Sequence, residues 1–208
     1  MKNKTLSIAT LLLTGALLFA GCGQTGNTTG NTSSTTAGQE TATTEQTDST
    51  AQTASDSTAS TNDIFTNMDT TDIDGNKIDS SIFAKNKVTL VNVWNVGWTP
   101  CVNEIPDLDK INSEYKDKGA AVYGLYGDLG MGISDDEMAQ IKDIMSNANA
   151  SYTQLRMDGT LATNESLLNI MAYPTTYVVG SDGTILDTIE GSKDYEGWKA
   201  LIDSYLAE

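Results

Sequence analysis

The stretch VTLVNVWNVGWTPCVNEIP, residues 88–106, constrains the fold of this chain more than any other. Its mainly apolar start, from Val88 to Trp94, predicts a strand buried on both faces. After Gly97, the pattern predicts a helix that begins near Pro100. A buried strand that delivers a cysteine to the start of a helix is typical of redox sites with a Cys-x-x-Cys motif. Here the four positions are Trp98, Thr99, Pro100 and Cys101, so one thiol of that motif is absent.

Composition excludes several classes of site. The 208 residues carry a net charge of −16 and include no histidine. Nucleic acid binding needs a basic patch, so we expect no nucleic-acid partner. Without histidine, Ser-His-Asp, Cys-His and histidine-based zinc sites are impossible. The two cysteines, Cys22 and Cys101, are too few for a disulfide framework or a four-cysteine metal site, and we expect neither a metal nor another cofactor.

The first residues have the pattern of an export signal. Lys2 and Lys4 precede an apolar run that ends in Phe19-Ala20-Gly21-Cys22. That ending resembles a bacterial lipoprotein signal, which implies removal of residues 1–21 and attachment of lipid to Cys22. An ordinary secretory signal with an incidental cysteine is the alternative. A lipid anchor would hold the protein at the bacterial cell membrane, facing outside the cytoplasm, without a spanning helix.

A polar segment separates this signal from the rest of the chain. Residues 23–62 contain no Val, Ile, Leu, Met, Phe, Tyr or Trp. Such a segment cannot bury enough apolar area to offset its chain entropy, so residues 22–62 are predicted to be a lipidated cysteine followed by a disordered tether. The folded domain is therefore predicted to span residues 63–208.

Within that domain, strand and helix patterns alternate. Asp74-Gly75-Asn76 predicts a turn between two short strands rather than a calcium loop, whose twelfth position would be Glu and is here Ser81. Strands are predicted at 88–94, 120–126, 152–157, 175–179 and 184–189. Helices are predicted at 100–118 with a bend at Pro106, at 134–148 with a capping box from Ser134, at 162–171 and at 195–206. This order predicts an α/β fold with a mixed central sheet flanked by helices.

Three motifs in this order carry a resemblance to a known family. The stretch VTLVNVWNVGWTPCVNEIPDL resembles the strand, active-site turn and kinked first helix of the thioredoxin superfamily. Ala172-Tyr173-Pro174-Thr175-Thr176, followed by Asp182-Gly183, resembles its cis-proline loop and next turn. The helical insert at 134–148 is similar to that of the membrane-anchored TlpA/ResA-like branch, which has a redoxin or AhpC-TSA-like domain. The resemblance covers nearly all of residues 63–208, and it implies a thioredoxin-like fold with an N-terminal hairpin and a thiol-disulfide oxidoreductase ancestry.

The same resemblance implies roles for individual residues. Trp98 stands where the family has its nucleophilic cysteine, and Cys101 matches the resolving cysteine. Glu104 matches an acidic residue that assists proton transfer; the alternative is an exposed carboxylate in the first turn of a helix. Tyr173, Pro174 and Thr175 would line a groove for an extended peptide, with a cis bond before Pro174.

Three functions remain open from the sequence. Cys101 can act as a monothiol or with reduced redox activity, on extracytoplasmic protein thiols or disulfides, with a membrane electron-transfer protein as a further partner. Alternatively the domain is a non-catalytic module that binds a partner through the groove and Trp98, unless Trp98 only fills the space of missing side chains. A peroxiredoxin-like peroxidase is the third hypothesis, but that class has a threonine where Trp98 lies and an activating arginine that Arg156 does not match.

Overall fold

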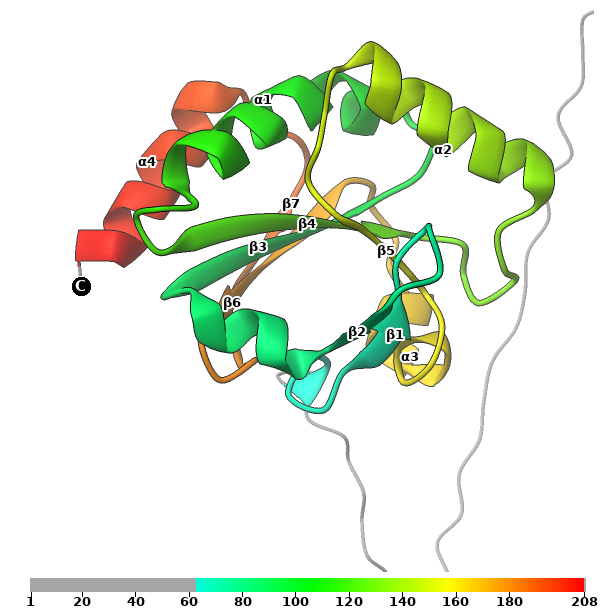
Figure 1. Cartoon of the computed structure of the whole chain (residues 1–208), viewed down its shortest axis with the longest axis horizontal. Helices are drawn as coiled ribbons and strands as arrows, with labels where there is room; N and C mark the ends of the chain where they lie inside the picture. Colours follow the sequence, from blue (N-terminus) through cyan, green and yellow to red (C-terminus); the bar gives the residue numbers. More distant parts are fainter. Residues whose placement is uncertain (1–62, 208) are drawn as a thin grey trace, which may run out of the picture. The chain divides into compact units, whose positions relative to one another are not determined.

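The computed structural model describes residues 63–207 (Figure 1). The expected signal peptide, Cys22 and the tether lie outside the described residues. In chain order the elements are β1 (Asp69–Thr71), β2 (Lys77–Asp79), the 3₁₀ helix η2 (Ser80–Lys85), β3 (Val88–Trp94), α1 (Thr99–Tyr115), β4 (Ala120–Tyr126), α2 (Asp135–Asn147), β5 (Gln154–Arg156), the 3₁₀ helix η3 (Leu161–Thr163), α3 (Glu165–Leu168), β6 (Thr175–Gly180), β7 (Ile185–Glu190) and α4 (Tyr195–Ala207).

The central sheet is mixed, as the sequence predicts. Its strand order is β5-β4-β3-β6-β7, with β3 in the middle. β3 pairs in parallel with β4 and antiparallel with β6, and β6 continues into the antiparallel hairpin with β7. All seven residues of β3 are buried, because the strand has a neighbour on each side and a layer of helices or loops on each face.

Each face of the sheet has its own apolar core. Helices α1, α2 and α4 cover one face, whereas the β1–β2 hairpin, η2 and α3 lie at the other (Figure 1). The period of two along β3 divides the strand between these cores, with Leu90 and Trp94 under α1 and Val91 and Val93 on the opposite face. The expected inward face of α1 is confirmed: Ile105, Leu108, Ile111 and Tyr115 are all buried.

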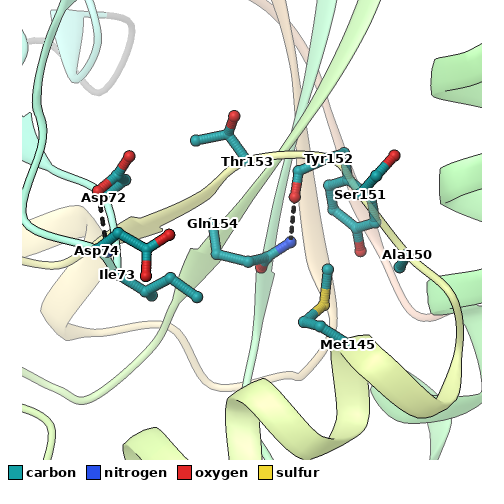
Figure 2. Close-up of a pocket in the computed structure, with 9 residues that line it drawn as sticks. All are labelled: Asp72, Ile73, Asp74, Met145, Ala150, Ser151, Tyr152, Thr153 and Gln154. Atoms are coloured by element: carbon teal, nitrogen blue, oxygen red, sulfur yellow. Dashed lines mark hydrogen bonds between the residues drawn. The ribbon is translucent and has the colours of Figure 1, made fainter.

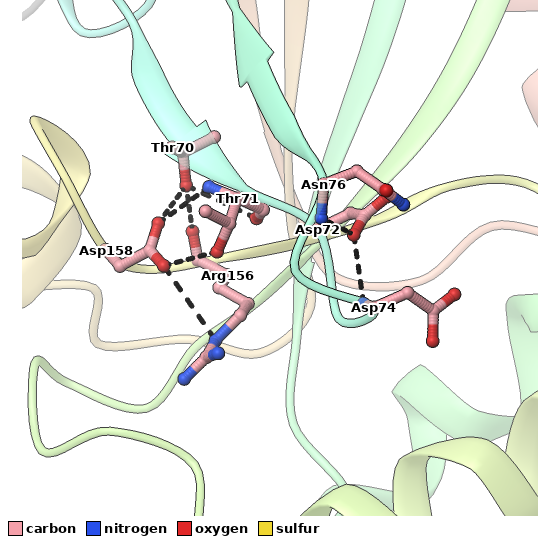
Figure 3. A network of polar contacts seen from close by, with 7 residues as sticks. All are labelled: Thr70, Thr71, Asp72, Asp74, Asn76, Arg156 and Asp158. Carbon is pink, nitrogen blue, oxygen red and sulfur yellow. Dashed lines mark hydrogen bonds and ion pairs between the residues drawn. The ribbon is translucent and has the colours of Figure 1, made fainter.

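The N-terminal hairpin is also confirmed. β1 and β2 pair antiparallel, and Gly75 in the turn has a φ of +85°, which favours glycine. Asp72 closes the turn, since its Oδ1 accepts hydrogen bonds from the backbone N–H of Asp74 (2.9 Å) and Asn76 (2.8 Å). Asp158, which follows β5, ties this hairpin to the sheet by accepting hydrogen bonds from Thr70 and Thr71, as Figure 3 shows.

Three predicted elements differ from the structure by more than one residue at an end. The helix expected at 162–171 is wrong, because only η3 and the four-residue α3 form there. Asn164 divides them: it has extended dihedral angles, and its side-chain oxygen accepts hydrogen bonds from the N–H groups of Ser166 and Leu167, so a new helix must start at this point. The strand expected at 152–157 shortens to β5, and α1 ends at Tyr115 rather than at Lys118.

The predicted capping box is present at the start of α2, where Ser134 and Glu137 exchange hydrogen bonds.

Across residues 63–207, none of the helices combines the length and apolarity that a membrane crossing needs.

Candidate functional site

The turn between β3 and α1 is fixed by the side chain of Asn95. Its Nδ2 donates to the Gly127 carbonyl (3.0 Å) and to the Tyr126 hydroxyl (3.3 Å), both at the end of β4. Its Oδ1 accepts from the Gly97 N–H at 2.9 Å. α1 then begins after Trp98, with Pro100 in its first turn as predicted. The turn that carries Trp98 and Thr99 is therefore held against the neighbouring strand.

Cys101 points into the core beneath α1. Its side chain is 0% exposed, and it is a free cysteine. Burial raises the pKa of the thiol to about 11, although the backbone N–H of Asn95 acts in the opposite direction. The nearby charge of Glu104 contributes to this increase in the pKa. A thiol in this environment stays protonated at neutral pH, and the thiolate is the form that attacks disulfides.

Trp98 occupies the surface of the same turn. It is 48% exposed, and its ring lies 5.9 Å from the ring of Tyr173, centroid to centroid. The bond between Tyr173 and Pro174 is cis, as the family resemblance implies. Pro174 and Thr175 are buried, and the Thr175 hydroxyl donates to the Ala172 carbonyl at 2.8 Å. The structure thus brings Trp98 together with Tyr173, one of the three predicted groove residues.

Glu104 lies one turn along α1 from Cys101 and is only 2% exposed, so the alternative of an exposed first-turn carboxylate is wrong. Its Oε1 accepts from Asn92 Nδ2 at 2.9 Å, and its Oε2 accepts from the Lys193 backbone N–H at 3.2 Å. Burial raises the pKa of Glu104 to about 7, against these hydrogen bonds, which lower it. Glu104 is also one of the residues that line a surface cavity of about 240 Å³, together with Lys193.

Two buried amides escaped the sequence prediction. Asn92, in the middle of β3, donates through Nδ2 to both Glu104 and the Thr176 hydroxyl, each at 2.9 Å. Gln154 on β5 accepts from the Trp94 indole at 2.8 Å and donates to the Tyr152 carbonyl at 3.2 Å. For Asn92 the available signal was an amide inside a mainly apolar strand, because a buried amide needs partners.

Gln154 also lines a cavity of about 200 Å³ between the hairpin turn, the end of α2 and β5 (Figure 2). None of the WTPC residues lines it.

Arg156, considered above for a peroxidase, lies on β5 with its Nε 3.9 Å from Asp158 (Figure 3). Among residues 63–207, no cluster of three or more Cys, Asp or Glu side chains is arranged to hold a metal ion.

Comparisons with known proteins agree with this fold. The family model described as Redoxin matches residues 45–201. The thiol-disulfide oxidoreductase ResA of Bacillus thuringiensis subsp. konkukian is 24% identical over 141 residues, which cover 67% of this chain and 73% of ResA. The thioredoxin-like protein YneN of Bacillus subtilis is 28% identical over 120 residues, which cover 58% of this chain and 66% of YneN.

Solved structures of similar fold include a thiol:disulfide interchange protein of Chlorobium tepidum TLS. It has a TM-score of 0.55 and 20% identity, over 67% of this chain and 93% of that one. A thiol:disulfide interchange protein of Bacteroides sp. gives a TM-score of 0.53 and 20% identity, over 68% and 86%. With the family match covering most of its length, this chain belongs to the Redoxin family, within the TlpA/ResA-like branch of the thioredoxin superfamily.

Proposed function

We propose that this chain is a lipid-anchored, extracytoplasmic redoxin that has lost dithiol exchange and uses the groove beside its former redox turn to bind a protein partner. The proposal rests mainly on the exposure of the two ends of the WTPC turn. Its exposed first position holds the indole of Trp98, whereas Cys101, which carries the only thiol of the turn, is 0% exposed. Beside it, Trp98 contacts Tyr173, which the sequence predicts to line a partner-binding groove with Pro174 and Thr175.

Dithiol exchange needs two thiols that alternate between reduced and disulfide forms. Cys101 has no second thiol within the described residues. With a pKa of about 11, roughly one Cys101 side chain in ten thousand is ionised at pH 7. Any ionisation of Glu104 disfavours the thiolate further, so the environment around Cys101 opposes nucleophilic attack.

The monothiol hypothesis requires Cys101 to become exposed, form a mixed disulfide with a partner and be released by a thiol of that partner. The buried position and raised pKa of Cys101 argue against this route. A trapping experiment in cells separates the two hypotheses. Disulfide-linked adducts that vanish in Cys101→Ser support the monothiol, whereas partner capture that is unchanged in Cys101→Ser supports binding.

The proposed loss of exchange is tested by insulin reduction with dithiothreitol, using the full chain carrying Cys22→Ser. We expect turnover at the background rate, and we expect Trp98→Cys to gain activity because it restores a thiol at the exposed end of the turn. Trp98→Ser is the matched control, since it removes the same indole without adding a thiol. Robust turnover by the starting protein that is abolished by Cys101→Ser would falsify the proposal.

The proposed anchor rests on the sequence around Cys22 and has its own test. Cells fed labelled palmitate should incorporate label into the full chain, and Cys22→Ser should remove it. Unchanged labelling of Cys22→Ser would exclude Cys22 as the lipidated residue.

A further inference from the structure

Four large apolar side chains are exposed around the Trp98 turn. They are Trp98 (48%), Leu129 (46%), Met131 (82%) and Met171 (92%). Within residues 63–207, the one other exposed large apolar side chain is Leu186, which lies apart on β7. Scattered single apolar residues are ordinary on protein surfaces, but a cluster on adjoining loops marks an interaction site.

The loops that carry these side chains meet at Tyr173. Trp98 contacts its ring, and Gly127 packs so closely on that ring that a Cβ at position 127 would lie 2.6 Å from it. Asn95 joins the first two loops through the Gly127 carbonyl. We name the set of Trp98, Leu129, Met131 and Met171 the Met–Trp surface.

Leu129 and Met131 lie on either side of Gly130, in the loop after β4. A Cβ at Gly130 would lie 3.1 Å from the Leu168 side chain, so this loop rests on α3. α3 leads directly into the segment that carries Met171. The loop after β4 and the segment before the cis-proline are thus neighbours, so the four exposed side chains of the Met–Trp surface lie on adjoining segments.

Charges around the Met–Trp surface have one sign. Residues 95–98, 127–137 and 169–174 contain no Lys or Arg, whereas the second segment has the exposed carboxylates Asp135 and Asp136, the half-buried Glu137 of the helix cap and the buried Asp128. The charge of Arg156, on β5, lowers the pKa of Asp128. However, the Nε of Arg156 also lies 3.9 Å from Oδ2 of Asp158. In a chain of net charge −16, this edge repels anionic lipid and repels the same edge of a second copy.

We propose that the Met–Trp surface binds a basic amphipathic segment of another protein. The apolar face of that segment would lie on Trp98, Met131 and Met171, and its lysines or arginines would face the acidic edge. Methionine suits this role because its unbranched, polarisable side chain adapts to varied apolar partners. The proposal rests on the binding role proposed above, extends it beyond the groove at Pro174 and requires no thiol.

The test uses the full chain carrying Cys22→Ser and a fluorescein-labelled peptide of about 18 leucine and lysine residues, patterned as an amphipathic helix. One control peptide has the same composition in scrambled order, and the other has glutamate at every lysine. By fluorescence anisotropy, we expect both controls to bind at least about tenfold more weakly than the patterned basic peptide.

Variants of the protein then locate the site. Met131→Gln combined with Met171→Gln should weaken binding of the basic peptide by about tenfold or more, while Leu186→Gln, a control at a side chain that is 50% exposed on β7, should change it by less than about twofold. Equal affinity for the scrambled peptide, or no effect of the methionine substitutions, overturns the proposal. A dimer in sedimentation that Met131→Gln disperses also overturns it, because the occupant is then a second copy.

Insulin reduction measured on the same samples separates this proposal from the one above. Specific peptide binding together with robust insulin turnover leaves the Met–Trp surface standing and overturns the loss of exchange. Absence of both binding and turnover overturns the Met–Trp surface and leaves the loss of exchange standing.

Discussion

The Trp98 indole and the Tyr173 phenol lie side by side, with ring centroids 5.9 Å apart and planes inclined by 38°. Gly127 packs closely against Tyr173, since a Cβ at position 127 would lie 2.6 Å from the ring and 2.6 Å from its hydroxyl oxygen. The position of Trp98 on the surface therefore depends on the absence of a side chain at Gly127.

Gly127→Ala is predicted to displace Tyr173 and to lower the free energy of unfolding by about 1–3 kcal/mol, the usual cost of overpacking. In a Tyr173→Ala background the same change should cost less than half as much, because the clashing ring is gone. Urea unfolding of the four proteins measures this coupling. Strictly additive effects would show that the alanine is accommodated without moving Tyr173.

Cys101 is predicted to react slowly with iodoacetamide in the native chain. A pKa of about 11 and a fully buried sulfur should slow labelling at pH 8 by at least about 100-fold relative to the chain unfolded in urea. Cys22→Ser makes Cys101 the sole thiol, so mass spectrometry follows a single reaction. Native labelling as fast as in urea, or a rate profile with a midpoint below pH 8, contradicts the protected environment.

Asp158 is predicted to stabilise the hairpin against the sheet. Burial raises its pKa, but hydrogen bonds from Thr70 and Thr71 outweigh that effect and hold the pKa below its usual value (Figure 3). Asp158→Ala should therefore lower the free energy of unfolding at pH 7 by about 1–2 kcal/mol, and less as the pH falls and the carboxylate is protonated.

Asp74→Ala is the matched control for this prediction. Asp74 pairs with Lys142 at 3.1 Å, but both side chains are more than half exposed, so its loss should cost less than about 0.5 kcal/mol. Equal effects of the two substitutions in urea unfolding at pH 7 would mean that the Asp158 network contributes no more than a surface ion pair.

The fold was accessible from the sequence because its signals are local. The apolar run of β3 and the capping box at Ser134 are each confined to one element or its end, and each predicts a structure that is present. The helix expected at 162–171 failed because its apolar residues suit a helix while Asn164 satisfies backbone N–H groups with its own side chain. The spacing of apolar residues does not show whether backbone N–H groups bond to a side chain or to the backbone of a helix.

The environment of the site was less accessible, because it depends on pairs that are far apart in the sequence. Glu104 accepts hydrogen bonds from Asn92, which is 12 residues away in the sequence, and from the Lys193 N–H, which is 89 residues away. Neither the burial of the carboxyl nor its altered pKa follows from the place of Glu104 in the helix pattern. Likewise, the contact of Trp98 with Tyr173 joins two motifs whose separate identities were predicted but whose packing was not.

Glu104 is predicted to make the chain less stable as the pH rises. Burial raises its pKa from 4.5 to about 7, so between these values the folded chain keeps a proton that the unfolded chain releases. The folded state then binds more protons, and the free energy of unfolding must fall with increasing pH, by up to about 3 kcal/mol in total, before levelling above pH 7. Glu104→Gln cannot ionise, so its profile should lack this decline. Urea unfolding of both proteins from pH 4.5 to 8 gives the difference directly, and parallel profiles would mean that Glu104 titrates in the folded chain as it does in the unfolded one.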